Sequence, residues 1–211
     1  MAAVTDAEAA QFRETGVLLK PHFFSAEEAR AMKAAVEELR SAGHMTDIHF
    51  NDEHENLQMP WMSLHQRLFQ LLPWEARTVE AVERLLEAEE GVEVHYDQLF
   101  YKPALTGGPT SWHTDNGYFQ IRDPLKGLGM WIACDDASAA NGTLHVAPWR
   151  PADPEIPHVR DFRGGDGSEG AGLTCRDEVD DESAVPCELP AGGVVFFAYG
   201  VPHCTRANPT N

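Results

Sequence analysis

Residues 192–200 read GGVVFFAYG, a short apolar run that is bounded by glycine on both sides. Runs of this kind, ended by Gly, Pro or Asn, are typical of β-strands separated by turns. The same form recurs at 127–136 (GLGMWIACDD), 142–148 (GTLHVAP) and 184–190 (AVPCELP). Several short strands divided by turn signals favour an all-β sandwich or closed jelly roll over βαβ units.

The N-terminal part of the chain has a different period. Residues 25–28 (SAEE) form a capping box, and the helical spacing that follows predicts a helix ending near Gly43. A second helical pattern ends at Pro73 and a third at Gly91. We therefore expect one domain over residues 1–211, with a mainly helical part at 1–91 and a β core at 92–211.

After Gly91 the stretch 92–102 (VEVHYDQLFYK) predicts a strand. Every second residue of a strand faces the same way. One face of this strand then carries Val92, Val94, Tyr96, Gln98, Phe100 and Lys102.

Residues 150–184 form the longest irregular stretch, rich in Gly, Pro and acidic residues. We call it the excursion. Its composition predicts a mobile segment over one end of the barrel, because loops of this length are often lids. A solvated loop with no role is the alternative.

The net charge of −18, from 16 basic and 34 acidic residues, argues against nucleic acid and anionic membranes as partners. The N-terminus resembles no signal peptide, and no apolar run is long enough to cross a membrane. The four cysteines include no CxxC pair. A cytoplasmic protein with reduced thiols is the expectation, and a monomer is the simplest assumption.

The stretch 111–119 (SWHTDNGYF) sets an imidazole and a carboxylate two positions apart. On a strand, His113 and Asp115 project from the same face and can hold one metal ion. His203, which follows the 192–200 run, supplies a third ligand. Two His and one carboxylate form the facial triad of non-haem iron oxygenases. A structural zinc site would usually need a fourth protein ligand. Each of the three residues also has a simpler explanation when it is considered alone: a hydrogen-bonded histidine, or an aspartate that begins a turn.

Several motifs together resemble the phytanoyl-CoA dioxygenase family of Fe(II)- and 2-oxoglutarate-dependent oxygenases. They are SWHTDNGYF at 111–119, GMWIACDDASAANGTLHVAP at 129–148, GGVVFFAYGVPHCTRANPT at 192–210, and FRETGVLLKPHFFSAEEARAM at 12–32. The likeness spans nearly the whole chain. It implies a mainly β, double-stranded β-helix (a cupin-like jelly roll) with N-terminal α-helices packed outside.

The resemblance also implies roles for individual residues. His113, Asp115 and His203 match the family's iron ligands, while Gln98 and Trp131 match positions that line the 2-oxoglutarate pocket. The family binds the distal carboxylate of 2-oxoglutarate with an Arg beyond the second His, and the chain stops at Asn211 before that position. We therefore expect either that the chain is truncated, which is the favoured reading, or that Lys102 supplies the cation. Arg206 faces away from His203 on a regular strand.

The function implied is a dioxygenase that uses Fe(II), 2-oxoglutarate and O₂ to hydroxylate a small-molecule metabolite, forming succinate. In this family a carboxylate ligand such as Asp115 favours hydroxylation over halogenation. Two alternatives stay open: a cupin-like metalloprotein that does not use 2-oxoglutarate, and a non-catalytic jelly-roll binding protein. Asn116, Tyr118 and Phe119 follow the ligand pair and are candidates to line the mouth of the site. Substrate identity is not encoded in any motif, and the negative net charge favours a small neutral or cationic metabolite.

Overall fold

The computed structural model describes residues 2–47, 55–161, 172–175 and 178–211. Its α-helices are α1 (Asp6–Thr15), α2 (Ala26–Ser41), α3 (Arg67–Leu71), α4 (Ala76–Leu86) and α5 (Asn116–Phe119). Its strands are β1 (Val17–Lys20), β2 (Thr46–Asp47), β3 (Leu57–Pro60), β4 (Gln98–Tyr101), β5 (Thr110–His113), β6 (Leu128–Ile132), β7 (Leu144–Val146), β8 (Val159–Asp161), β9 (Gly172–Thr174), β10 (Val185–Pro186), β11 (Val194–Ala198) and β12 (His203–Thr205).

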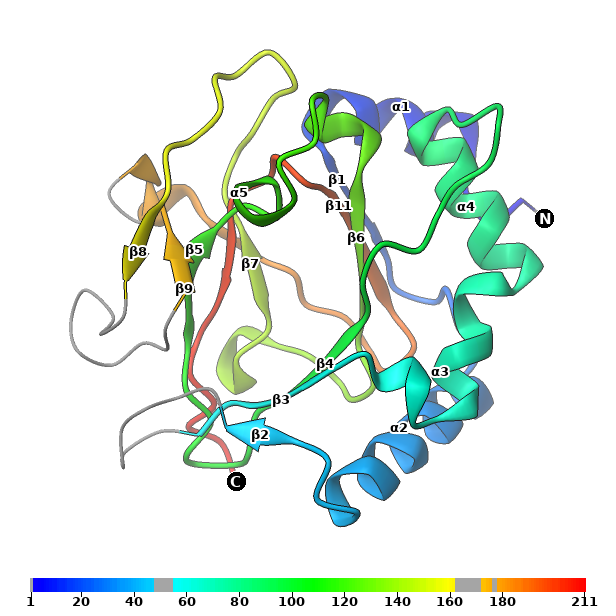
Figure 1. Cartoon of the computed structure of the whole chain (residues 1–211), viewed down its shortest axis with the longest axis vertical. Coiled ribbons are helices and arrows are strands. Elements are labelled where there is room, and N and C mark those ends of the chain that lie inside the picture. The colour runs from blue at the N-terminus through cyan, green and yellow to red at the C-terminus, as the bar shows by residue number, and fades with distance from the viewer. Residues whose placement is uncertain (1, 48–54, 162–171, 176–177) are drawn as a thin grey trace.

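Two antiparallel sheets form the centre of the molecule (Figure 1). One has the strand order β1-β11-β6 and the other β10-β7-β12-β5. Strands that are far apart in sequence pair directly, with Val17 opposite Phe197 and His203 opposite His113. This pairing is the jelly roll that the turn-bounded runs and the family resemblance predict.

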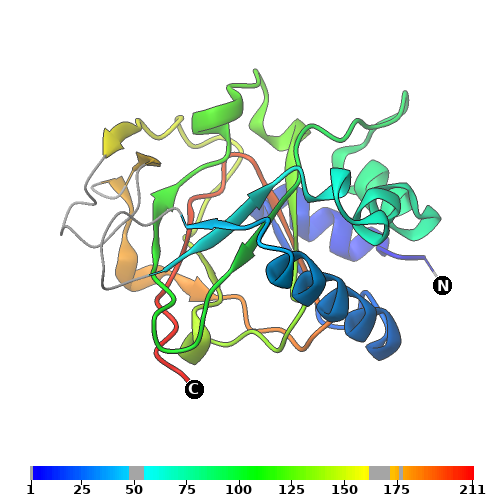
Figure 2. The same cartoon turned by 60° about the horizontal axis from the view of Figure 1, so that its bottom comes forward.

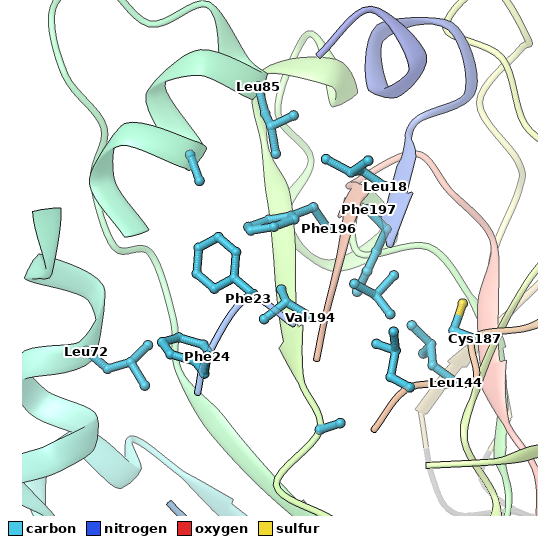
Figure 3. Close-up of a cluster of buried hydrophobic side chains, with 14 of the residues drawn as sticks. Leu18, Phe23, Phe24, Leu72, Leu85, Leu144, Cys187, Val194, Phe196 and Phe197 are labelled. Carbon is cyan, nitrogen blue, oxygen red and sulfur yellow. The ribbon is translucent and has the colours of Figure 1, made fainter. Parts of the chain in front are cut away.

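The helices α1, α2, α3 and α4 cover the outer side of the β1-β11-β6 sheet (Figures 1 and 2). On that side the ring of Phe196 packs edge-on against Phe23, with ring centroids 5.5 Å apart (Figure 3). Arg77 of α4 lies over Phe24 at 4.5 Å. Every residue of β11 is buried, which suits a strand in the middle of its sheet with packing on both faces. The expected helices packed outside a β core are therefore present.

The helix boundaries differ in part from the expectation. α2 begins at the predicted capping box of Ser25 and Glu28. The second helical pattern is instead divided into two 3₁₀ turns, Met62–Leu64 and Leu72–Trp74, with α3 between them. α4 ends with Glu87 in the left-handed region (φ 49°), four residues before the predicted stop at Gly91.

The strand predicted at 92–102 is shorter in the structure, where it forms β4 of a third sheet, β2-β3-β4. Only residues 98–101 are extended in a sheet, and the buried residue of β4 is Leu99, which joins the core beside Met59 of β3. The other face, which carries Gln98 and Phe100, turns away from that core. The sequence pattern placed the apolar packing on the wrong face, because Phe100 is an apolar residue that stays 40% exposed.

The excursion is more regular than its composition predicted. β8 and β9 pair antiparallel within it, and β9 lies against β5, where the Cys175 N–H donates to the Trp112 carbonyl (2.8 Å). Residues 162–171 and 176–177 of the excursion lie outside the described residues.

The four cysteines are free in the structure, and Cys175, Cys187 and Cys204 are buried. Burial raises the pKa of Cys134 and Cys187 to about 12, so these thiols are protonated at neutral pH. Among the described helices, none has both the length and the apolar character needed to cross a membrane.

Candidate metal centre

His113, Asp115 and His203 meet at one point between the sheets. One ligand atom from each lies within 4.8 Å of the other two. His113 ends β5 and His203 begins β12, and these two residues are direct partners in the antiparallel register. Their ring centroids are 4.2 Å apart, and His203 Nε2 lies 3.7 Å from Asp115 Oδ1. The three residues singled out in the sequence are therefore brought together by the fold.

The two imidazoles are oriented in the same way. Nδ1 of His113 lies 2.8 Å from the carbonyl oxygen of Ser111, and Nδ1 of His203 lies 2.9 Å from that of Val201. A carbonyl can only accept, so each Nδ1 carries the proton and donates. The tautomer is thereby fixed, and each Nε2 keeps its lone pair for a metal.

Burial determines the protonation states of His113, Asp115 and His203. Desolvation lowers the pKa of both His113 and His203 to about 4, so the rings are neutral at pH 7. Desolvation also raises the pKa of Asp115, against the effect of His113. The Asp115 side chain keeps 21% of its surface exposed, which leaves room for a ligand in front of the carboxylate.

This donor set fits ferrous iron. Two neutral nitrogen donors and one carboxylate oxygen are the protein ligands of a facial-triad iron site, and such a site leaves coordination positions open for other ligands. Buried imidazoles held in one tautomer by backbone carbonyls are also what a metal site requires of its surroundings.

Trp131 lies on β6, opposite Val195 of β11. It shares a face of β6 with Gly129, whose missing side chain makes room for the ring of Phe197. Phe197 in turn packs against His203, with centroids 4.5 Å apart. Because Trp131 and Phe197 share a face of the sheet, Trp131 projects to the side on which His203 lies.

Gln98 lies on the face of β4 opposite to the buried Leu99. Its Oε1 accepts a hydrogen bond from Nε2 of Gln58 on β3. Gln58 was not singled out in the sequence, although its position next to β4 in the sheet gives Gln98 the partner that a half-buried amide needs.

Lys102 directly follows the last residue of β4 and is half-buried. Its ammonium group donates to the Gly108 carbonyl, and its electrostatic neighbour is Cys204, the residue directly after His203. Burial lowers the pKa of Lys102 to about 7. Arg206 is engaged elsewhere: it pairs with Asp181 at 2.5 Å and lies over Trp112, as the strand parity predicted.

Asn56 is a polar residue that sequence reasoning missed. It is fully buried, and neither its amide nitrogen nor its amide oxygen has a hydrogen-bond partner among the residues that the structure describes. A buried amide of this kind is usually satisfied by water or a ligand. Glu55, the residue before it, pairs with Gly107 and accepts from Gly108, so Asn56 lies near the loop that binds Lys102.

A cavity of about 830 Å³ lies between α5 and the excursion, and none of the three candidate ligands is among its described lining residues. Asn116 and Tyr118 line it together with Glu155 and His158. Tyr118 also packs edge-on against the ligand His113, with centroids 5.8 Å apart. Phe119 packs instead against Tyr199 (4.8 Å) and His95 (4.7 Å).

Known proteins resemble this chain in sequence and in structure. An ectoine dioxygenase from Stutzerimonas stutzeri (strain A1501) is 25% identical over 95% of this chain and 70% of its own length. The 2-oxoglutarate complex of EvdO2 from Micromonospora carbonacea var. aurantiaca is 25% identical with a TM-score of 0.74, covering 98% of this chain and 86% of that one.

The non-haem α-ketoglutarate-dependent carbocyclase SnoK from nogalamycin biosynthesis has a TM-score of 0.82 at 18% identity. The match covers 100% of this chain and 81% of that one, and at this identity it shows a shared fold. The sequence profile of the family described as Phytanoyl-CoA dioxygenase (PhyH) matches residues 12–211. These matches confirm the predicted jelly-roll oxygenase fold and the predicted dependence on iron and 2-oxoglutarate. The chain belongs to the phytanoyl-CoA dioxygenase family.

Proposed function

We propose that this protein is a hydroxylase of small-molecule metabolites in which His113, Asp115 and His203 hold Fe(II). The observation that carries the proposal is the convergence of these three side chains within 4.8 Å, with both imidazoles fixed in the tautomer that presents Nε2. Bound iron and 2-oxoglutarate supply the oxidising chemistry, in which O₂ is consumed, 2-oxoglutarate becomes succinate and CO₂, and the substrate gains a hydroxyl group.

The protein's own residues hold the metal ligands in place and exclude water from them. The carbonyls of Ser111 and Val201 hold the imidazoles, so little reorganisation accompanies metal binding. Phe197 covers one side of His203 and excludes water there. The Asp115 carboxylate adds the anionic ligand that balances part of the metal's charge.

We assign Gln98, Trp131 and Lys102 to the 2-oxoglutarate pocket. Gln98 has its Oε1 bound by Gln58, which leaves its Nε2 donors for a carboxylate. Lys102 is a half-buried cation beside Cys204 of β12, and the desolvation that lowers its pKa would be offset by a carboxylate partner. The unpartnered amide of Asn56 near the same loop supports a polar ligand at this end of the barrel.

The cavity between α5 and the excursion supports a neutral or cationic substrate. Among the described residues that line it, Glu155 is the charged one, and no Lys or Arg is present. Phosphate-rich molecules such as CoA thioesters need basic partners, which the described lining does not offer. The cavity volume lies in the range of metabolite-binding pockets.

We further infer one oxygenase domain over residues 1–211, because β1 of the N-terminal part pairs with β11 of the core. A monomer in the cytoplasm that binds neither nucleic acid nor membranes is the simplest assignment. The net charge of −18 and the absence of disulfides support it.

The function is tested by measuring succinate formed from 2-oxoglutarate in the presence of Fe(II), O₂ and ascorbate. The wild-type protein should form succinate, and Asp115→Ala should reduce the rate to background because it removes the anionic ligand. Asp135→Ala is the matched control, since Asp135 is exposed and pairs with Lys33 on the surface.

The two alternatives give other results. A metalloprotein that does not use 2-oxoglutarate would bind iron without forming succinate, and a binding module would bind neither. Undiminished turnover in Asp115→Ala would refute the ligand assignment.

A further inference from the structure

The segment that carries two of the three candidate ligands has two faces. His113 and Asp115 face the metal centre. Trp112 and Thr114 flank His113 and are buried, with exposed fractions of 4% and 2%, and Asn116 at the start of α5 is buried as well (3%). What buries this second face is the excursion.

Hydrogen bonds join that face to the described parts of the excursion. They are Cys175 N–H to the Trp112 carbonyl (2.8 Å), Trp112 Nε1 to Asp181 (2.7 Å), Thr114 N–H to His158 Nε2 (2.9 Å), Asn116 Nδ2 to Glu155 (3.3 Å) and Leu173 N–H to the Tyr118 hydroxyl (2.9 Å). The excursion is thus attached to the back of the ligand segment at nearly every second residue.

The bond to His158 differs from the others in its position. The N–H of Thr114 belongs to the peptide unit that links His113 to the residue before Asp115, so it lies between the two ligands in the chain. When His158 accepts this hydrogen bond, it restricts rotation of the backbone that sets the separation of the two ligand side chains. The other contacts act outside the interval between the ligands.

Gly117 makes room for this contact. A Cβ at position 117 would lie 2.8 Å from both Nε2 and Cδ2 of His158 and 2.9 Å from Cε1. These separations are shorter than a carbon atom tolerates, so any side chain at 117 must displace the imidazole. The glycine after Asp115-Asn116 is therefore explained by the close approach of His158.

The imidazole of His158 must be neutral to accept this hydrogen bond. Burial lowers the pKa of His158, with Ile156 and Glu155 acting in the opposite direction. A neutral ring with its proton on Nδ1 keeps a lone pair on Nε2, which a protonated ring lacks.

We propose that His158 is a positioning residue for the metal centre: it holds the backbone between His113 and Asp115 in the conformation that lets both bind one ion. The proposal rests on the metal site assigned above. It gives the excursion a role in the oxygenase, because its residue His158 preorganises ligands that it does not touch.

The test is the affinity of the protein for Co(II), followed by the visible absorption of the bound ion under anaerobic conditions. His158→Leu removes the acceptor, His158→Gln keeps an acceptor oxygen at the position of Nε2, and Gly117→Ala displaces the ring. His22→Leu is the matched control, because it makes the same substitution at an exposed histidine outside the site.

We expect Co(II) to bind about tenfold more weakly to His158→Leu and to Gly117→Ala, the lower end of the loss seen when a second-sphere partner is removed. His158→Gln should bind within about twofold of wild type, and His22→Leu should be unchanged. The double variant His158→Leu/Gly117→Ala should be no weaker than either single one, because both remove the same contact. Melting temperatures of the metal-free variants separate lost positioning from lost folding.

The proposal is overturned if folded His158→Leu binds Co(II) as tightly as wild type, or if His158→Gln is as weak as His158→Leu. Failure of the wild-type protein to bind Co(II) at all would overturn the metal site itself, and is therefore distinguishable from failure of the positioning role.

Discussion

His113 and His203 each use one ring nitrogen for the fold and keep the other for the metal. The bond from Nδ1 to a backbone carbonyl two residues earlier is a local one, so each strand orients its own ligand. The site then depends on the pairing of β5 with β12, which sets the two rings 4.2 Å apart.

Lys102 gives a pH-dependent prediction at the same scale. Its pKa is about 7 in the folded protein against 10.5 for an ordinary lysine, so it loses its charge as the pH rises above 7. If Lys102 binds the distal carboxylate of 2-oxoglutarate, binding takes up a proton above pH 7. The dissociation constant of 2-oxoglutarate should then rise by up to about tenfold per pH unit.

Titration of the iron-loaded protein with 2-oxoglutarate at pH 7 and pH 8.5 measures this effect. Lys102→Arg stays charged and should remove most of the pH dependence, while Lys102→Met should bind weakly at both values. Equal affinity in wild type and Lys102→Met at pH 7 would show that another cation serves.

The sequence was sufficient to predict the ligands but not the residues that support them. The pairing of His113 with Asp115 assumed one strand through both residues. The structure ends β5 at His113 and places Asp115 in the turn that follows (φ −60°, ψ −31°), and the two side chains still converge. Gln58 and His158 approach from other strands or from the excursion, so no spacing relates them to the residues that they contact. Asn56 is detectable only once its burial is known.

Among the elements, helix α1 and strand β1 meet at Gly16, which ends α1 in the left-handed conformation (φ 71°). A Cβ at this position would lie 2.6 Å from the ring of Trp149 and 2.7 Å from Val201. Gly43, just after α2, has nearly the same φ (72°) with nothing within 4 Å. The two glycines therefore separate the effect of backbone conformation from that of packing.

We predict that Gly43→Ala lowers the free energy of unfolding by about 1 kcal/mol, the usual cost of a left-handed L-residue. Gly16→Ala should lower it by a further 1–3 kcal/mol or so, because the methyl group overpacks the core. Urea unfolding of the three proteins measures both values. Similar losses at the two positions would mean that the core at Gly16 accommodates the methyl group.

Element prediction succeeded where a local signal was complete. The capping box at Ser25 correctly located the start of α2. The same signal, Thr5 followed by Glu8, begins α1 and was overlooked. β4 was predicted too long and with its packed face inverted, because the alternation of residues 92–102 is apolar on one side while tertiary packing buries Leu99 on the other.

At the scale of the whole molecule, the net charge is −18. The described lining of the cavity contains Glu155 and no Lys or Arg, so it is acidic as well. Both disfavour an anionic substrate. We predict that neutral, zwitterionic or cationic metabolites stimulate O₂ consumption in the presence of 2-oxoglutarate, and that CoA thioesters do not. Screening both classes with an oxygen electrode checks this. Stimulation by an acyl-CoA would place the substrate outside the cavity next to α5.

The central claim is that three side chains from β5, the turn after it and β12 hold one ferrous ion that also binds 2-oxoglutarate. Anaerobic addition of Fe(II) and 2-oxoglutarate tests it most directly, by the weak visible charge-transfer band of the chelate. We predict the band in the wild-type protein and its loss in His203→Ala. A folded wild-type protein without the band, or a His203→Ala variant that keeps it at full amplitude, would contradict the account.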